Sequence, residues 1–320
     1  MSLLETTPAD WEYFTKGNAN LLFRYRGPLG KYTDKLLRVR LFNDLPDYVS
    51  TKTIVQYVKT NFEESFHKEL CEQELVKVSP DFLTGLSERC GHTLMCDDYA
   101  LVMPNLLRGV VQSVKLAKNC ILHIAQEEGS EVVTLEFKPK WLYDNTRIYC
   151  RNCAHGQMQG VPRHFCPLDL LHIERVTGAI DDMFLEMKKD ETKGILSYKS
   201  VLVSFFTNSD ILHRLKRIQS RSTQSVKDIT SAGDVTEELS LSMTLRDVTL
   251  FVEMRQGGTE YSESSDLFLI DGVAFSCKCY VIDLDLKANS KFRHWAKTEQ
   301  KLQEYYDRTE LDAWPGCFRK

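Results

Sequence analysis

Short apolar runs broken by glycine, proline or charge dominate the first 140 residues, and one longer segment among them has helical spacing. Residues 20–26 and 35–40 mix apolar and basic side chains around a Gly-Pro-Leu-Gly break, which predicts a hairpin. Apolar side chains recur at helical spacing from about 50 to 67, after a serine or threonine suited to capping, and predict a helix. The pattern predicts further strands at 99–103, 120–125 and 132–138.

The second half of the chain begins with an irregular stretch after residue 140 that is rich in Arg, Cys, His and Gly. A proline suited to the first helical turn then opens a helix predicted from 167 to about 188, and another is predicted over 209–220. The polar stretch 219–237 has too few apolar residues to bury, so we expect a mobile loop. The remaining predicted elements are strands at 200–206, 247–254 and 266–285 and a helix from about 289.

Length and composition indicate a chain that can build a sizeable core. With 320 residues and 42% hydrophobic content, it can fill one large domain or two lobes. We expect two lobes, an N-terminal one over 1–140 and a C-terminal one over 141–320, with part of the first sheet assignable to the second lobe. Mixed strands and helices of this kind predict an α+β fold.

Composition also excludes several classes of protein. No apolar run approaches 18 residues and no charged-then-apolar leader opens the sequence, so we expect an intracellular protein without membrane contacts. The ten cysteines are interpreted as reduced thiols without disulfides. A net charge of −4 argues against generic nucleic-acid binding, because affinity for phosphate backbones comes from a basic excess spread over a surface. An anionic ligand must therefore meet a local basic cluster.

Charged residues follow two of the apolar runs. Residues 280–287 read Tyr-Val-Ile-Asp-Leu-Asp-Leu-Lys, so Asp283 closes a strand shortly before Lys287 and Lys291. An uncompensated buried carboxylate is costly, so a metal ion or these lysines must compensate it. Upstream, a Lys-Pro-Lys box at 138–140 ends another run, and its proline stops central pairing and directs two lysines out of the strand end. Both patterns favour a phosphate ligand.

Two further features have a chemical and an ordinary interpretation. The loop Gly-Asn-Ala-Asn at 17–20 has side chains small enough for backbone N–H groups to approach a phosphate, but taken alone such a sequence is more often an ordinary loop. Asp247 opens an apolar strand and forms, with Asp283, a candidate pair for magnesium and proton transfer. Taken singly, each aspartate is as readily a turn or salt-bridge residue.

The middle of the chain holds the residue types of a zinc site at Cys150, Cys153, His155, His164 and Cys166. Two cysteines with two intervening residues, a nearby histidine and a further cysteine offer the ligands of a tetrahedral zinc ion. Their spacing matches no recognised ribbon or finger. We therefore favour buried thiols beside a basic substrate loop over a metal.

Taken in chain order, these boxes resemble the inositol-pentakisphosphate 2-kinase family over nearly the whole chain. The boxes are Asp-Trp at 10–11, Gly-Asn-Ala-Asn-Leu-Leu at 17–22, Glu-Phe-Lys-Pro-Lys at 136–140, the segment from Arg151 to His155, Pro-Leu-Asp-Leu at 167–170 and Ile-Asp-Leu-Asp-Leu-Lys at 282–287. The small size and the cysteine-rich middle are similar to the fungal branch.

The resemblance implies transfer of the γ-phosphate of ATP, with magnesium, to the 2-hydroxyl of inositol 1,3,4,5,6-pentakisphosphate, which gives inositol hexakisphosphate (phytate). It implies a two-lobed inositol polyphosphate kinase fold, distantly like protein kinases, with mixed and antiparallel sheets and a hinge near 103–105. It also implies a nuclear location. We expect a monomer whose partners are these two small molecules.

The resemblance further implies roles for individual residues. Lys138 would bridge the transferred phosphate, and Asp247 would receive the hydroxyl proton and hold the metal together with Asp283. The residues implied for ATP are Gly17, Asn18, Ala19, Asn20, Arg38, Met103, Asn105 and Glu136. The residues implied for the inositol phosphates are Arg89, Lys140, Asn208, Lys287, Lys291 and Trp295.

The sequence departs from the family pattern in places. Asn18 stands where relatives usually carry a second glycine, which restricts how the loop folds over phosphate. No basic residue directly follows His155, and Arg151 and Arg163 are the substitutes at hand. Lys291 stands where relatives often carry arginine, so it supplies charge without a bidentate fork.

Two other classes of protein compete with this interpretation. A non-catalytic inositol-phosphate-binding module on a kinase-like fold would keep the lysines without needing both Asp247 and Asp283. A kinase of protein substrates would carry His-Arg-Asp and Asp-Phe-Gly motifs, which the sequence lacks. We therefore rank the inositol phosphate kinase first and the protein kinase last.

Overall fold

The structure, a computed structural model, describes residues 2–3, 5–44, 47–127, 130–144, 150–160, 164–187, 195–257 and 265–306. Two compact units make up the chain, Met1–Arg108 and Gly109–Lys320. Each unit combines helices with a six-stranded sheet, so the fold class is α+β, as predicted. This division falls before the lobe boundary predicted at 140, and the strands between 109 and 140 belong to the second unit.

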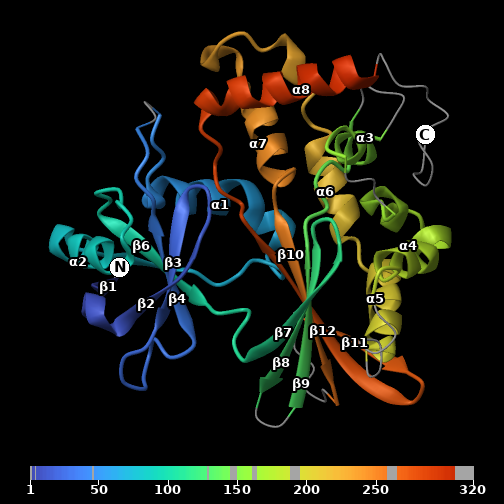
Figure 1. Ribbon diagram of the computed structural model, residues 1–320, viewed down its shortest axis with the longest axis horizontal. Coiled ribbons are helices and arrows are strands. Elements are labelled where there is room, and N and C mark those ends of the chain that lie inside the picture. Colours follow the sequence, from blue (N-terminus) through green and yellow to red (C-terminus); the bar gives the residue numbers. More distant parts are fainter. Residues whose placement is uncertain are drawn as a thin grey trace. The chain divides into compact units, whose positions relative to one another are not determined.

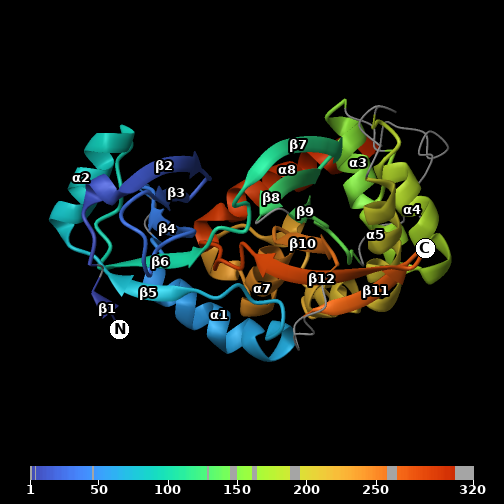
Figure 2. The same ribbon diagram turned by 90° about the horizontal axis from the view of Figure 1, so that it is seen from below.

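The first unit is built on a sheet with the strand order β1-β5-β6-β4-β3-β2 (Figures 1 and 2). β1 runs parallel to β5, and the other neighbouring strands are antiparallel. The strands are β1 (Ser2–Leu3), β2 (Trp11–Lys16), β3 (Asn20–Tyr25), β4 (Lys35–Arg40), β5 (Glu74–Lys77) and β6 (Tyr99–Pro104). The described helices are α1 (Thr51–Phe66), α2 (Pro80–Cys90) and the 3-10 helix η1 (Pro8–Asp10).

Serine caps start both α-helices of the first unit. The Ser50 hydroxyl accepts a hydrogen bond from the N–H of Thr53, and the Ser79 hydroxyl accepts one from the N–H of Phe82. Gly91, in the left-handed conformation at φ 69°, ends α2. One face of α2 joins one face of the sheet in a single apolar cluster, whose members include Trp11, Leu21, Phe23, Leu37, Val39, Val76, Leu83, Leu86, Ala100 and Val102.

The second unit has an antiparallel sheet in the order β11-β12-β10-β9-β8-β7. Its strands are β7 (Val110–Ala117), β8 (Cys120–Glu127), β9 (Ser130–Phe137), β10 (Thr249–Gln256), β11 (Asp266–Ile270) and β12 (Val273–Ile282). Its described α-helices are α3 (Arg151–Met158), α4 (Val176–Met183), α5 (Leu196–Asn208), α6 (Ile211–Gln219), α7 (Glu237–Leu245) and α8 (Phe292–Tyr306). Its 3-10 helices are η2 (Pro167–Leu171), η3 (Ile173–Arg175), η4 (Val226–Asp228), η5 (Ala232–Asp234) and η6 (Asn289–Lys291).

Aromatic side chains join α5 to the sheet of the second unit. Between ring centroids, Phe206 lies 6.0 Å from Phe137 of β9, and Tyr198 lies 5.5 Å from Phe275 of β12. Such edge-to-face pairs stabilise the packing beyond the apolar area that they bury. Because neighbouring residues of a strand point to opposite faces, the residue before Phe137 points away from α5. No helix in the described part of the chain is both long and apolar enough to cross a membrane.

Several predicted elements are confirmed, and one predicted strand is wrong. The elements that lie where the sequence pattern predicts them are β3, β4, β6, β8, β9, β10, α1, α6 and α8. The strand predicted at 200–206 lies instead inside α5, where Val201, Leu202 and Phe205 are buried at helical spacing. A short apolar run suits either structure, and only the packing decides.

Two further predictions need correction. The helix predicted from 167 to 188 is instead three shorter helices, η2, η3 and α4, the last of which ends at Met183. The segment 219–237 does bury apolar residues, because Val226 and Ile229 pack in one cluster with Phe292 and Trp295 of α8. In Figure 1, α7 leads from this segment down into β10, and α8 crosses the start of α7.

Truncation of Ile229 tests whether this segment is anchored. Ile229→Ala should lower the free energy of unfolding by roughly 2–5 kcal/mol, because it removes a buried side chain that packs in one cluster with Phe292 and Trp295. Lys227→Ala, an exposed position of the same segment, is the control and should change little. Chemical denaturation measures both, and equal small effects would show that the segment does not contribute to the core.

Candidate functional site

Three neighbouring strands of the second unit bring separate boxes of the sequence to one end of the sheet. β9 and β12 end there and β10 begins there, because Phe137 pairs with Leu250 and Thr249 pairs with Ile282. The residues that leave the sheet at this end are Lys138 after β9, Asp247 before β10 and Asp283 after β12. The order of the strands therefore brings Lys138 together with two aspartates that lie more than a hundred positions after it in the sequence.

Asp247 lies between two lysines. The Lys140 ammonium donates to Oδ1 of Asp247 at 2.7 Å, and the Lys287 ammonium donates to Oδ2 at 2.8 Å. Burial alone would raise the pKa of Asp247, but the nearby charges of Lys287 and Lys140 outweigh it and hold that pKa well below its usual range. Both carboxylate oxygens are thus engaged in charge-assisted hydrogen bonds.

Asp283 forms a second group beside the first. The Thr249 hydroxyl donates to Oδ2 of Asp283 at 2.7 Å, and the Lys138 ammonium lies 3.3 Å from the same oxygen. About half of the Asp283 side chain is exposed, and its backbone is left-handed at φ 66°. A half-exposed carboxylate next to a strand end offers the hard oxygen donors that magnesium prefers.

Gln219, at the end of α6, holds the backbone on both sides of the Lys140–Asp247 pair. Its Oε1 accepts from the N–H groups of Leu142 at 2.9 Å and Tyr143 at 3.2 Å. Its Nε2 donates to the carbonyl oxygens of Lys140 at 3.0 Å and Leu245 at 3.2 Å. The side chain is completely buried, so these bonds lie in a water-poor setting where a lost partner is costly.

Lys140 itself has a left-handed backbone, at φ 60°. That conformation is unfavourable for a residue with a Cβ, so the surrounding contacts must hold it. The hydrogen bond from Gln219 to the Lys140 carbonyl is one such contact. Gln219 was not predicted as a site residue; the available signal was a glutamine on the apolar face of α6, four positions after Leu215.

Glu136 of β9 is hydrogen-bonded to a buried histidine of β8. Oε2 of Glu136 lies 3.1 Å from Nε2 of His123, and Nδ1 of His123 lies 2.8 Å from the Ser113 hydroxyl of β7. Because Glu136 precedes Phe137, it points to the sheet face opposite α5. His123 and Ser113 were not predicted, since cross-strand neighbours depend on a register that one sequence does not reveal.

The predicted nucleotide residues of the first unit lie around β3 and β4. The N–H of Gly17 donates to the carbonyl of Asn20 at 2.9 Å and closes the loop that contains Asn18 and Ala19. Arg38 and Arg40 lie two residues apart on one face of β4, opposite the face that buries Leu37 and Val39. Arg40, which was not predicted, donates from Nη1 to Oδ1 of Asn20 at 3.0 Å.

The predicted hinge residues, Met103 and Asn105, lie near the C-terminal end of the first unit. Met103 of β6 pairs with Leu36 of β4, two positions from Arg38. Asn105 donates its N–H to the carbonyl of Asp34 at 2.9 Å and accepts from the N–H of Leu107 at 3.2 Å.

Two other predicted substrate residues lie near the ends of helices. Arg89 is exposed on α2 of the first unit, where it lines a pocket with Glu12 and Arg26. Asn208 ends α5, and its amide donates to the carbonyl of Ser204 at 2.8 Å.

The remaining residues of this set lie near or on α8. Trp295 is 8% exposed and packs in the apolar cluster that contains Val226 and Ile229. Lys291 ends η6. Nε of Arg151 lies 3.4 Å from Oε2 of Glu299 of α8, whereas Arg163 lies outside the described residues.

Comparison with known proteins places the chain in one family. The family profile described as inositol-pentakisphosphate 2-kinase matches residues 13–301. The inositol-pentakisphosphate 2-kinase of Debaryomyces hansenii is 34% identical, over 98% of this chain and 96% of that protein. Proteins of the same name from Saccharomyces cerevisiae and Yarrowia lipolytica are 26% and 27% identical, over 90% and 95% of this chain and 94% and 95% of theirs.

A pair of substitutions at Lys140 isolates the strain of its backbone. Lys140→Gly and Lys140→Ala remove the same ammonium group from Asp247, but only glycine is relaxed at φ 60°. The glycine variant should therefore be the more stable by about 1 kcal/mol in chemical denaturation.

The control pair is Lys301→Gly and Lys301→Ala, inside α8. Here the alanine variant should be the more stable, because glycine weakens a helix interior. If the alanine variant were the more stable one at both positions, the backbone of Lys140 would not be strained.

Proposed function

The chain belongs to the inositol-pentakisphosphate 2-kinase family, and we propose that it transfers the γ-phosphate of ATP to the 2-hydroxyl of inositol 1,3,4,5,6-pentakisphosphate. The product would be inositol hexakisphosphate. A kinase requires ATP and a divalent metal ion, and we propose magnesium as that ion. The observation that carries the proposal is the position of Asp247 between the ammonium groups of Lys140 and Lys287.

This arrangement complements the chemistry of the acceptor. On the inositol ring, the carbon with the 2-hydroxyl lies between carbons 1 and 3, and both of these carry a phosphate. Lys140 and Lys287 flank the Asp247 carboxylate in the same way. A hydroxyl that faces Asp247 would therefore place its two neighbouring phosphates near the two lysines, which supports a base flanked by phosphate-binding groups.

We propose that the acceptor also changes the basicity of Asp247. Its pKa is well below the usual range because of Lys287 and Lys140. Phosphates that engage these lysines would draw the positive charge away and add negative charge, so the pKa of Asp247 would rise. Asp247 would then be a better acceptor for the 2-hydroxyl proton when a correctly phosphorylated ring is bound.

Lys138 and Asp283 fit the phosphoryl-transfer side of the reaction. We assign the metal to Asp283, because its half-exposed carboxylate at a strand end offers the oxygen donors that magnesium prefers. A bound magnesium ion would neutralise charge on the phosphate oxygens of ATP. Lys138, 3.3 Å from Asp283, would stabilise the phosphoryl group in transfer, where positioning and charge neutralisation supply most of the rate.

In the first unit, the sheet face with Arg38 and Arg40 is the proposed nucleotide surface. Two guanidinium groups and the closed loop 17–20 would supply donors for the phosphates of ATP. The roles of Met103 and Asn105 at the base, and of Glu136 toward the nucleotide, rest on the family resemblance. The remaining predicted contacts to inositol phosphates, Arg89, Asn208, Lys291 and Trp295, rest on the family resemblance.

The competing function is a non-catalytic inositol-phosphate-binding module. Incubation with ATP, magnesium and inositol pentakisphosphate, followed by separation of the products by charge, distinguishes the two. We expect inositol hexakisphosphate. Tight binding of the pentakisphosphate without product would support the binding module and refute the kinase.

Substitution of the two aspartates should separate chemistry from binding. Asp247→Ala and Asp283→Asn should each lower kcat roughly 100-fold or more, because proton transfer and metal binding act in the transition state. Asp228→Asn, an exposed position in η4, is the control and should keep wild-type turnover. If Asp247→Ala weakened only the binding of the acceptor, Asp247 would not be the base.

Basic residues of the two units should separate by ligand. Lys140→Ala and Lys287→Ala should weaken inositol pentakisphosphate binding by roughly ten- to a hundredfold and ATP binding much less, because each loses a charge-assisted phosphate contact. Arg38→Ala should show the opposite bias. Binding titrations of each ligand, with Lys227→Ala as the exposed control, measure both effects. An ATP-selective defect in Lys287→Ala would reverse the assignment.

We also propose that the protein is a nuclear monomer. The location is what the resemblance to the fungal branch of the family implies, and a small-molecule reaction does not require a second subunit. Localisation of a fluorescent fusion and sedimentation of the purified chain test the two statements separately.

A further inference from the structure

One buried threonine contacts Asp283, the carboxylate to which we assign the metal ion. Thr249 opens β10 and pairs with Ile282, the last residue of β12 and the neighbour of Asp283. Its hydroxyl donates to Oδ2 of Asp283 at 2.7 Å. Thr249 is 1% exposed, and a buried hydroxyl without a partner is costly. The hydrogen bond therefore satisfies Thr249 and fixes one oxygen of the carboxylate.

The two contacts of the Asp283 side chain fall on the same oxygen. The Lys138 ammonium lies 3.3 Å from Oδ2, the atom that already accepts from Thr249. No residue in the described part of the chain donates to the other oxygen, Oδ1. About half of the side chain is exposed. Thr249 and Lys138 therefore leave Oδ1 as the oxygen that an ion can bind.

The backbone restricts both partners of the hydrogen bond, but it does not fix the carboxylate plane. Threonine branches at Cβ and has few rotamers, and Thr249 lies in the regular pairing of β10 with β12. Asp283 has a left-handed backbone at φ 66°, which is unfavourable for a residue with a Cβ and holds only where its contacts support it. The carboxylate group itself turns readily about its last bond. The Thr249 hydroxyl restricts this rotation.

We propose that Thr249 is a positioning residue for the metal ion. Its hydroxyl holds Oδ2 of Asp283 and directs Oδ1 toward the ion. A residue that hydrogen-bonds a metal-binding carboxylate commonly sets its orientation, and its loss lowers metal affinity or activity roughly ten- to a hundredfold. The inference rests on the proposed function, because the assignment of magnesium to Asp283 is its premise.

Thr249 suits this role better than Lys138 does. The Lys138 ammonium is a charged donor for which the phosphate oxygens of ATP compete, and it lies farther from Oδ2. The Thr249 hydroxyl carries no charge, so it does not repel a cation on the same carboxylate. Thr249 therefore holds Asp283 whether Lys138 contacts the carboxylate or a phosphate.

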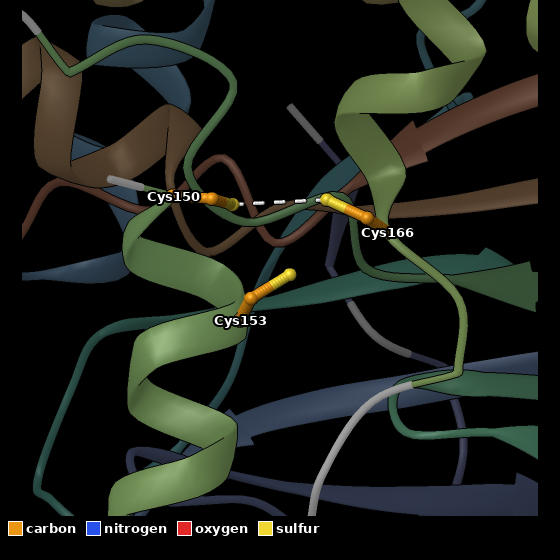
Figure 3. A group of neighbouring side chains, drawn as sticks. All are labelled: Cys150, Cys153 and Cys166. Atoms are coloured by element: carbon orange, nitrogen blue, oxygen red, sulfur yellow. Dashed lines mark hydrogen bonds between the residues drawn. The ribbon is translucent and has the colours of Figure 1, made fainter. Parts of the chain in front are cut away.

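A second group of potential metal ligands must be separated from Asp283 in any binding experiment. The Sγ atoms of Cys150, Cys153 and Cys166 all lie within 4.8 Å of one another, and neither His155 nor His164 belongs to this group within the described ranges. Figure 3 shows Cys150 and Cys166 directed toward each other, with the sulfur of Cys153 pointing into the same space. Thiolates select softer ions such as zinc, whereas Mn²⁺ and Mg²⁺ suit carboxylate oxygens. Manganese therefore reports on Asp283.

Binding of Mn²⁺ to the full-length protein tests the proposal without turnover. Electron paramagnetic resonance follows free Mn²⁺ as it is titrated into protein with a non-hydrolysable ATP analogue, and a titration without protein subtracts the ions held by the nucleotide. Thr249→Val keeps the shape of the side chain and removes its hydroxyl, so the Kd for Mn²⁺ should rise roughly tenfold or more. Thr249→Ser keeps the hydroxyl and should retain an affinity close to that of the wild type.

Thr134→Val is the matched control. Thr134 is a buried threonine of β9 in the same sheet, at 5% exposed, and the same change there should leave the Kd for Mn²⁺ unchanged. The melting temperature of Thr249→Val should change little, because valine keeps the packing and the half-exposed Asp283 can be hydrated. If Thr249→Val does not fold, Thr249→Ser and Thr249→Ala form a second pair that differs only in the hydroxyl, and the alanine variant should bind Mn²⁺ more weakly.

The magnesium dependence of turnover gives an independent measurement. In Thr249→Val, the magnesium concentration for half-maximal turnover should rise roughly tenfold, and the KM for inositol pentakisphosphate should stay unchanged. A purely structural role would change the KM and the melting temperature together.

Two results would overturn the proposal, and they can be told apart. If Asp283→Asn bound Mn²⁺ as tightly as the wild type, the metal assignment would fail and the role of Thr249 with it. If Asp283→Asn lost Mn²⁺ but the variants without the Thr249 hydroxyl kept wild-type affinity, only the role of Thr249 would fail, and the proposed kinase function would stand.

Discussion

The site depends on one interaction, in which the ammonium groups of Lys140 and Lys287 share the carboxylate of Asp247. Lys140 and Lys287 are partly buried, and each needs a negative partner. Asp247 supplies that partner in this structure, and the acceptor phosphates would supply it in the reaction. Under the proposed function, the lysines would therefore serve both as substrate contacts and as a control on the base. An acceptor that lacked a phosphate beside the 2-hydroxyl would leave one lysine on Asp247 and the base weak.

The fold makes this arrangement possible because β10 lies between β9 and β12. Strand pairing brings the ends of three strands together, and Gln219 then fixes the backbone at Lys140 and at Leu245, shortly before Asp247. Trp141, held by Asn152 and contacted by Arg246, adds a second connection between the same two segments.

The sequence reveals the charged boxes but not the groups that hold them. Lys140, Asp247 and Asp283 were predictable because charged residues stand at the ends of apolar strands, and the family resemblance then implied a separate role for each. Gln219 and His123 were not predictable, since a buried polar residue is recognised by its partners and those partners lie on distant segments. The strand predicted at 200–206 was wrong for the same reason: packing against the sheet, and not local preference, decides between helix and strand there.

The titration of the Asp247 carboxyl group tests the central claim most directly. Carbon-13 NMR of aspartate-labelled protein can follow it against pH, with the resonance assigned from the spectrum of Asp247→Asn. Without acceptor, the carboxylate should stay ionised well below pH 4, where unpaired aspartates take up protons. With inositol pentakisphosphate, the midpoint should move to higher pH. A midpoint near the ordinary aspartate value that the acceptor does not change would contradict the account.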